Sequence, residues 1–387
     1  MSLKTPLAWL QLVHEKPRFL AALAGIAFAD LLMFMQLGFQ LSIYYSQSEI
    51  HRRLKGDIVL ISAKTVSLQS MKSFSWRRLY QANSLEQVAS VKPLYLATLP
   101  DWKDPETGRS RIMLTIGFDP EQPVLDVPEV NQYLQALKAP DVFLFDRVSR
   151  GDFVEKVAAK IEREKSVTTE AGGRRINLIG LFTLGAMPVA DGNLITSDLN
   201  FVRLFRGRKL SEIDVGVISL KPNSDVQQVI SQLKTILPKD VRVLSKEEYI
   251  EFEKSYIVNS TDIGQIFNIG IIMGAIIGSV IVYQVFYSQI SENLPEYATL
   301  KAIGYQDSVL LGVIFRQALY LTVLGYIPGY ILALVFYDLT SNIIKVTIFM
   351  TLPSAILVFG LSFVICSVSA FISARKLRLA DPADIFS

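Results

Sequence analysis

The sequence is poor in the residues that build most catalytic and metal-binding sites. Its 387 residues include one cysteine, Cys366, and two histidines, His14 and His51. A single cysteine cannot form an intrachain disulfide, and two histidines cannot make a His-rich metal site. The chain also lacks the G-x-x-x-x-G-K-[ST], G-x-S-x-G, H-E-x-x-H and C-x-x-C motifs. We therefore exclude an ATP-binding P-loop and expect no catalytic residue and no cofactor or metal in this chain.

Charge is also scarce, because Asp, Glu, Lys and Arg make up 19% of the sequence, against about 25% in soluble domains. Four stretches of 29 or 30 residues contain at most one charge each: residues 19–48, 263–291, 308–337 and 346–374. The charges within them are Asp30 and Arg316. A helix needs roughly 20 apolar residues to cross a bilayer. The sequence therefore predicts a membrane protein with four transmembrane helices.

The remaining residues divide unevenly around these spans. The predicted segments are an N-terminal arm (residues 1–18), spans at residues 19–44, 264–287, 308–337 and 349–373, a polar domain at residues 45–263, loops at residues 288–307 and 338–348, and a tail at residues 374–387. The polar domain is long enough to bury its own core. We expect it to be α+β with two subdomains, the first split around a strand-rich insertion at about residues 120–200.

Two strand–helix–strand units support that expectation for the polar domain. In the later unit, apolar runs at residues 215–220 and 241–244 flank a helical period at residues 226–237. The earlier unit has strands at residues 57–62 and 95–99 with a helix near residues 84–90. Further strands are predicted at residues 111–118 and 141–145, and Gly172 and Gly173 predict a turn.

Basic residues near the spans predict the orientation of the chain. The flanks of the first and last spans carry Lys4, Lys16, Arg18, Arg375, Lys376 and Arg378. Because positive flanks stay inside and four spans return the chain to one side, both termini are predicted to be cytoplasmic and the polar domain extracytoplasmic. Residues 5–12 alternate apolar and polar, which predicts either an amphipathic helix at the inner membrane surface or an extension of the first span.

Small residues recur at helical spacing in the second and third spans. Gly270, Gly274 and Gly278 lie four apart and so share one helix face, which lets another helix pack closely. Gly325 and Gly329 repeat this pattern more weakly in the third span. The pattern predicts close helix packing, and it leaves open whether the partner helix belongs to the same chain or to a second copy.

The two charges inside the spans predict a second kind of contact. Asp30 and Arg316 lie at similar estimated depths, roughly 16 Å and 12 Å from the start of their spans. Because ionisable residues inside a bilayer seldom face lipid, we hypothesise a salt bridge between them, within or between chains. In the alternative, Arg316 extends towards the membrane surface and Asp30 finds another polar partner.

The loop between the second and third spans predicts a short helix. Asn293 suits its N-cap, Pro295 its first turn and Gly304 the position just past its end. Tyr297, Leu300 and Ile303 would form an apolar stripe. Such a helix either lies flat on lipid or inserts into a cytoplasmic partner.

At this loop the sequence resembles a known family. The stretch Glu296-Tyr-Ala-Thr-Leu-Lys-Ala-Ile-Gly304 resembles the E-x-x-x-L-[RK]-A-[IM]-G segment of permeases similar to the cell-division protein FtsX and the macrolide exporter MacB. Residues 374–386 resemble the closing segment of those permeases, and the layout of the spans agrees with theirs. Residues 3–12, 29–39 and 247–250 resemble the DevC branch, which contains permeases of a cyanobacterial exporter linked to heterocyst glycolipids.

The resemblance implies the fold, the function and the partners. It implies a MacB/FtsX-type (type VII) ABC transporter permease: four transmembrane helices, a large α+β periplasmic domain between the first and second, and a homodimer in the bacterial, here cyanobacterial, inner membrane. A separate DevA-like ATPase would bind ATP and Mg²⁺, a DevB-like membrane-fusion adaptor would act in the periplasm, and a TolC-like channel would complete export of a lipid-like substrate.

The resemblance also assigns a site on the cytoplasmic loop. The residues implied to contact the ATPase are Glu296, Tyr297, Leu300, Lys301, Ala302, Ile303 and Gly304. A different function stays open at this point, namely an FtsX-like regulator whose periplasmic domain activates a cell-wall hydrolase. A membrane-tethered enzyme is disfavoured by the missing catalytic motifs.

Overall fold

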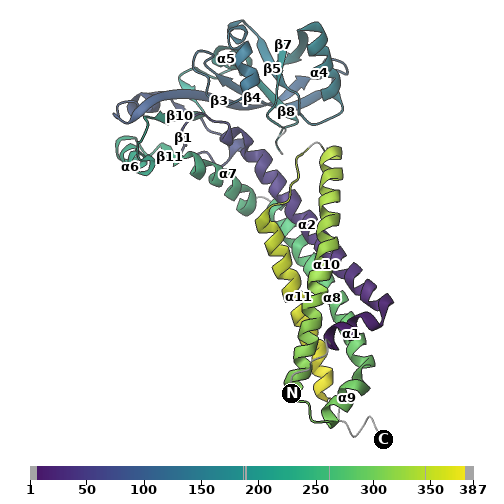
Figure 1. The fold of residues 1–387 in the computed structure, drawn as a ribbon. Helices are drawn as coiled ribbons and strands as arrows, with labels where there is room; N and C mark the ends of the chain where they lie inside the picture. Colours follow the sequence, from purple (N-terminus) through teal and green to yellow (C-terminus); the bar gives the residue numbers. More distant parts are fainter. Residues whose placement is uncertain (1–6, 186, 188–189, 261, 345, 380–387) are drawn as a thin grey trace. The chain divides into compact units, whose positions relative to one another are not determined.

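Figure 1 shows the computed structural model, which describes residues 7–185, 187, 190–260, 262–344 and 346–379. Residues 1–6 of the predicted arm and 380–387 of the predicted tail lie outside the described residues. The chain forms two compact units. The helical unit comprises Met1–Ser42, Asp262–Ile343 and Thr347–Ser387, and the α+β unit comprises Ile43–Thr261 and Ile344–Val346.

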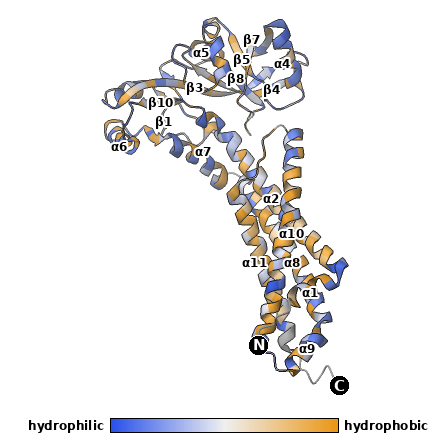
Figure 2. Cartoon of the chain, in the orientation of Figure 1, coloured by the Kyte–Doolittle hydropathy of each residue, from blue (hydrophilic) through white to orange (hydrophobic). Residues whose placement is uncertain are grey.

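Four helices in the described part of the chain are long and apolar enough to cross a membrane. They are α2 (Lys16–Arg52), α8 (Asp262–Glu292), α10 (Asp307–Ile344) and α11 (Leu352–Leu379). Figure 2 shows apolar residues along all four. Nearly all of the α+β unit falls between α2 and α8 in the sequence. The predicted arrangement of four spans, with an α+β domain between the first and the second, is therefore confirmed.

Two shorter helices complete the helical unit. α1 (Leu7–His14) is separated from α2 by a bend at Glu15, and α9 (Leu294–Ala302) lies between α8 and α10. A hydrophobic core lies at the end of the helical unit that contains α1 and α9. It combines residues of α1, α2 and α8–α11, and it includes Leu12, Ile26, Phe286 and Tyr297. We call this end the α9 end. Because Leu12 is only 4% exposed, α1 packs on the other helices and is not an extension of α2.

The α+β unit is built on one nine-stranded sheet with the strand order β11-β1-β10-β3-β4-β8-β5-β7-β6. Its strands are β1 (Ile58–Ser62), β3 (Val88–Lys103), β4 (Ser110–Phe118), β5 (Val142–Asp146), β6 (Val167–Ala171), β7 (Arg174–Phe182), β8 (Gly192–Ser197), β10 (Val215–Leu220) and β11 (Val241–Ser245). A small separate pair joins β2 (Phe74–Ser75) to β9 (Glu212–Ile213). The long strand β3 pairs with β10 along its first half and with β4 along its second, so it joins both halves of the sheet.

Helices cover one face of this sheet in two groups, as alternation of side chains along each strand requires. The helices on this face are α3 (Arg77–Ala82), α4 (Phe153–Glu164), α5 (Asp198–Leu204) and α6 (Val226–Ile236). α7 (Lys246–Ser260) and the short 3-10 turns η1 (Leu68–Ser70), η2 (Pro128–Tyr133) and η3 (Ala136–Lys138) pack on the other face. α3, α5 and α6 share one core with β1 and β10, whereas α4 shares another with β5 and β7. The opposite face has a single core across both halves, to which Tyr249 of α7 contributes.

The local predictions for this unit differ in accuracy. The strand–helix–strand unit at β10, α6 and β11 is confirmed, since α6 begins after Asp225, whose carboxylate caps it by accepting from the amides of Gln227 and Gln228. The predicted turn at Gly172 and Gly173 is also confirmed, because both have positive φ between β6 and β7. The helix predicted near residues 84–90 is wrong, because the helix is α3 and β3 already begins at Val88.

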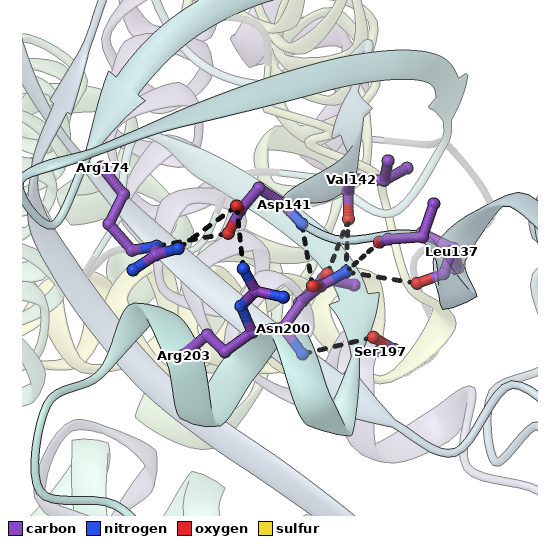
Figure 3. Close-up of polar contacts among 9 residues, drawn as sticks. Leu137, Asp141, Val142, Arg174, Ser197, Asn200 and Arg203 are labelled. Carbon is purple, nitrogen blue, oxygen red and sulfur yellow. Dashed lines mark hydrogen bonds and ion pairs between the residues drawn. The ribbon is translucent and has the colours of Figure 1, made fainter.

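A buried asparagine joins α5 to the start of β5 (Figure 3). The Asn200 side chain donates to the carbonyl oxygens of Leu137 (3.2 Å) and Ala139 (2.9 Å) and accepts from the amide of Asp141 (2.9 Å). The Asp141 carboxylate in turn accepts from Arg174 and Arg203. Asp141 has a φ of 58°, a left-handed conformation that these contacts hold in place.

Candidate functional site

The candidate site is α9, the helix in the loop between α8 and α10. Pro295 lies in its first turn and Gly304, with a φ of 101°, ends it, as the sequence predicted. Asn293 occupies the N-cap position, but its side chain donates to the Gln289 carbonyl of α8 (2.8 Å) and does not cap α9. The loop is therefore a helix that follows α8 directly and stops at a glycine.

Tyr297, Leu300 and Ile303 of the predicted apolar stripe differ in how deeply they are buried. Tyr297 is fully buried, Leu300 is partly buried against the core of the α9 end, and Ile303 is 71% exposed. The stripe was wrong because six residues along a helix turn by about 240°, which places Ile303 away from Tyr297. The exposed face of α9 contains Pro295, Glu296, Thr299, Ala302 and Ile303, and Gly304 follows it.

A hydrogen-bond cluster anchors the buried face of α9. Gln11 of α1 donates from Nε2 to Glu296 Oε2 (3.2 Å) and accepts at Oε1 from the Tyr297 hydroxyl (3.1 Å). Gln317 of α10 donates from Nε2 to the same Gln11 oxygen (3.1 Å). Tyr297 and Gln317 are fully buried and Gln11 is 9% exposed. One side chain of α1 thus contacts both α9 and α10.

The tyrosine at the centre of this cluster stays protonated. Burial, reinforced by the nearby Glu296 carboxylate, raises the pKa of Tyr297 to about 12. The hydroxyl therefore donates to Gln11 throughout the physiological pH range. Tyr297, expected from the resemblance to touch an ATPase, instead holds α9 on its own helical unit.

Partly exposed ion pairs lie at both ends of the loop that carries α9. Lys301 Nζ lies 3.0 Å from Asp307 Oδ1, which joins the last turn of α9 to the first residue of α10. Arg18, at the start of α2, bridges Glu15 and Glu292, the last residue of α8. The segment around α1 therefore contacts both the loop's first residues and α9 itself.

The glycine face of α8 packs within the chain. A side-chain carbon at Gly274 would stand 3.0 Å from Met33 Cγ, and one at Gly278 would stand 2.9 Å from Ala29 Cβ, so the two helices run antiparallel. At Gly270 such a carbon would also meet a side chain of α2. The Gly270–Gly278 face is thus covered by α2 of the same chain, and this face is not available to a second copy.

The proposed ion pair between Asp30 and Arg316 does not form within the chain. Asp30 is 1% exposed, accepts a hydrogen bond at Oδ1 from Ser362 of α11 and lies against Gly329 of α10. Arg316 is exposed and precedes Gly329 by 13 residues, or about 20 Å along α10. The depth estimate failed because it took Phe19 and Ser308 as level. Pairing between chains stays a hypothesis.

The α+β unit has acidic residues in a loop, but they serve its structure. Asp104 accepts from the Glu106 amide (3.0 Å) and the Thr107 hydroxyl, and Asp101 accepts from the Gly172 amide (3.1 Å). Within the described residues, no three His, Cys, Asp or Glu side chains are grouped so that they could hold a metal ion.

Sequence reasoning missed three residues that matter at these sites. Gln11, Gln317 and Ser362 are polar side chains buried in the helical unit. The signal was a polar residue on the apolar face of a predicted helix, since such a group is buried only when it has a partner. Its partner is on another helix and cannot be read from spacing.

Comparison with known families finds a match over the C-terminal part of the chain. Residues 268–382 match the family described as "FtsX-like permease C-terminal". This range contains α9 and nearly all of α8, α10 and α11. This part of the chain is thus similar to FtsX-like permeases, and it contains three of the four described helices that are long and apolar enough to cross a membrane.

Two solved structures are each similar to about half of the chain. The periplasmic region of MacB from Actinobacillus actinomycetemcomitans is 13% identical, with a TM-score of 0.35 over 55% of this chain and 97% of that one. The extracellular domain of the noncanonic ABC-type transporter YknZ from Gram-positive bacteria is 11% identical, with a TM-score of 0.30 over 48% and 98% of the two chains. No curated protein sequence matches this chain.

Proposed function

We propose that this protein is the permease subunit of an ABC exporter and that α9 is the helix through which an ATPase subunit moves it. The observation that carries the proposal is the division of α9 into two faces. One face is fixed to the helical unit through Tyr297 and through Glu296, which accepts from Gln11, and the other exposes Ala302 and Ile303. A helix held on one side and free on the other can receive a partner and pass on its movement.

The ATPase is a separate chain in this proposal. The sequence has no G-x-x-x-x-G-K-[ST] motif, so ATP and Mg²⁺ would be bound by a DevA-like partner. We propose a homodimer of this chain. Since α2 covers the glycine face of α8, the second copy would use other apolar surfaces, such as the exposed Ile272, Ile276 and Val280 of α8.

The further assembly follows from the sequence resemblance. We propose that both termini are cytoplasmic and that the α+β unit lies in the periplasm of a cyanobacterium, where it works with a DevB-like adaptor and a TolC-like channel. The substrate class would be a glycolipid, as in the branch that residues 3–12 and 29–39 resemble. The α+β unit would push substrate towards the adaptor when α9 moves.

Purification of the intact complex tests this function. The full-length chain, tagged and extracted from its native membranes, should co-purify with a P-loop ATPase and a periplasmic adaptor, and the complex should hydrolyse Mg²⁺-ATP. Deletion should remove a lipid from the outer membrane. Co-purification of a cell-wall hydrolase with the ATPase, and no lipid loss, would instead support the FtsX-like regulator. A chain that purifies without any ATPase would refute both.

A further inference from the structure

The N-terminal helix α1 is built into the contact between α9 and α10. Leu12 of α1 belongs to the core of the α9 end, and Trp9 packs edge-on against Phe19 (6.2 Å between ring centres) and Tyr320 of α10 (5.8 Å). Gln11 lies between these two contacts on the inward face of α1. From the sequence we predicted here either a helix at the membrane surface or an extension of the first span, and neither prediction included a contact with α9.

The side-chain amide of Gln11 forms three hydrogen bonds, which join α1 to α9 and α10. Its nitrogen donates to Glu296, and its oxygen accepts from both Tyr297 of α9 and Gln317 of α10. Tyr297 and Gln317 are fully buried, so neither can separate from Gln11 without leaving a buried polar group unpaired, which is unfavourable in a core. A displacement of α9 would therefore displace Gln11 through Tyr297, and Gln11 would displace α10 through Gln317.

The loop that connects α9 to α10 is a second path between the two helices. Gly304 and three further residues join the two helices, and a glycine with positive φ is a flexible point in the chain. The ion pair of Lys301 with Asp307 bridges the joint, but Asp307 is half exposed and the pair is screened by water. The path through Gln11 is buried, whereas Gly304 and Gln306 of the connection are exposed to water.

We propose that Gln11 is the positioning residue that transmits movement of α9 to α10, so that α1 is part of the coupling apparatus. This inference rests on the proposed function, because the movement is supplied by an ATPase bound to α9. Gln11 touches neither ATP nor substrate, and it acts through Glu296, Tyr297 and Gln317.

An exchange of amide and carboxylate tests the contact. Gln11→Glu keeps the acceptor for Tyr297 and Gln317 but removes the donor to Glu296 and sets two carboxylates against each other. Adding Glu296→Gln restores the hydrogen bond with its direction reversed, because the amide at position 296 now donates to the carboxylate at position 11. The matched control is Gln306→Glu, the same change at an exposed residue of the α9–α10 connection, where Ser308 can still donate to the new carboxylate.

The readout is movement at the far end of α10. Asn342→Cys places an exposed thiol there, and the native Cys366 is buried and so is not labelled. The labelling rate with a water-soluble maleimide is measured in the purified ATPase complex, with and without Mg²⁺-ATP and vanadate. The nucleotide-dependent change should fall about tenfold in Gln11→Glu and return in the double variant, with the ATPase bound in every case.

Each outcome decides the inference. The inference is overturned if Gln11→Glu, made in the Asn342→Cys background, shows the same nucleotide-dependent change in labelling rate as Asn342→Cys alone, or if the double variant shows no larger change than Gln11→Glu. It is also overturned if the Gln306→Glu control is equally impaired, or if nucleotide changes the labelling rate in none of the variants. Loss of ATPase from the double variant would show that Glu296 binds the partner directly and would also overturn it. Failure of the proposed function is distinct, because the unmodified chain would then purify without an ATPase.

Discussion

Gly329 of α10 lies directly against Asp30 of α2, and a side-chain carbon at position 329 would stand 2.9 Å from Asp30 Cβ. The same carbon would lie 3.0 Å from the Ala27 carbonyl oxygen, a backbone atom that cannot move aside as a flexible side chain can. One turn earlier, a side-chain carbon at Gly325 would stand 2.7 Å from Cγ2 of the Ile26 side chain. α2 and α10 therefore run parallel and approach closely because these two positions have no side chain.

Gly329→Val should destabilise the helical unit through this contact. Overpacking of this kind costs about 1–3 kcal/mol in the free energy of unfolding. Thermal or denaturant unfolding of the full-length chain in detergent would measure the loss. Gly360→Val of α11 is the matched control, since nothing lies within 4 Å of a side-chain carbon there. Equal losses in the two variants would contradict the close approach of α2 and α10.

Ser362→Ala should also weaken the helical unit, for an electrostatic reason. Asp30 Oδ2 has no hydrogen-bond partner among the described residues, and Ser362 is the donor to Oδ1. Its removal would leave the whole carboxyl group unpaired, at a cost of about 1–3 kcal/mol. Ser367→Ala is the control, because no described residue bonds the Ser367 hydroxyl. The unfolding free energies of both variants should be compared in the same detergent.

The contribution of Glu253 to stability should depend on pH. Glu253 of α7 is 1% exposed and accepts from Gln47 (2.7 Å) and from the Leu68 amide. Burial raises the pKa of Glu253, and these hydrogen bonds offset only part of the rise. Because the folded-state pKa exceeds the ordinary value of 4.5, the folded chain binds this proton more tightly.

The sign of that dependence follows directly. The contribution of protonated Glu253 to the free energy of unfolding is fully present below the pKa that Glu253 has in the unfolded chain. It is lost as the pH rises through the pKa that Glu253 has in the folded chain. The unfolding free energy of the unmodified chain, relative to Glu253→Gln, should therefore increase as the pH falls from neutral towards 4.5. Parallel denaturation curves at several pH values measure this difference. A constant difference, or one that decreases with falling pH, would contradict the assigned environment.

Asn200→Ala should destabilise the α+β unit far more than Arg203→Ala. Asn200 is 2% exposed, and its loss leaves the carbonyl oxygens of Leu137 and Ala139 without their donor, at about 1–3 kcal/mol for each unpaired group. Arg203 forms a partly exposed ion pair with Asp141, which is worth about 0–1 kcal/mol. Denaturant unfolding of the two variants measures the loss of unfolding free energy in each. Similar losses would contradict the prediction.

Local sequence signals predicted most of the elements. The four spans follow from charge-free runs, because a helix in lipid must satisfy its backbone internally and cannot contain many charges. The unit at β10, α6 and β11 follows from periodicity and from the cap at Asp225. The helix near residues 84–90 failed because its polar residues belong to a turn before β3, whereas α3 is only six residues long.

Contacts between distant segments could not be predicted in the same way. The register of α2 against α10 places Asp30 beside Gly329, and no count within one span gives that register. The partners of Gln11 lie 285 and 306 positions away. The helix α9 was predicted correctly from Pro295 and Gly304, yet its buried face depends on α1 and therefore needed the structure.

The central claim, that the exposed face of α9 binds an ATPase, is tested most directly at Ile303. Leu300 is less suitable because it packs against the core, whereas Ile303 is 71% exposed. Ile303→Asp should leave membrane insertion normal but lower the ATPase retained on the purified chain by at least about tenfold, the size expected for a central interface residue. Ile236→Asp, the same change at an exposed residue of α6, should retain the ATPase fully. Full retention by Ile303→Asp would contradict the account.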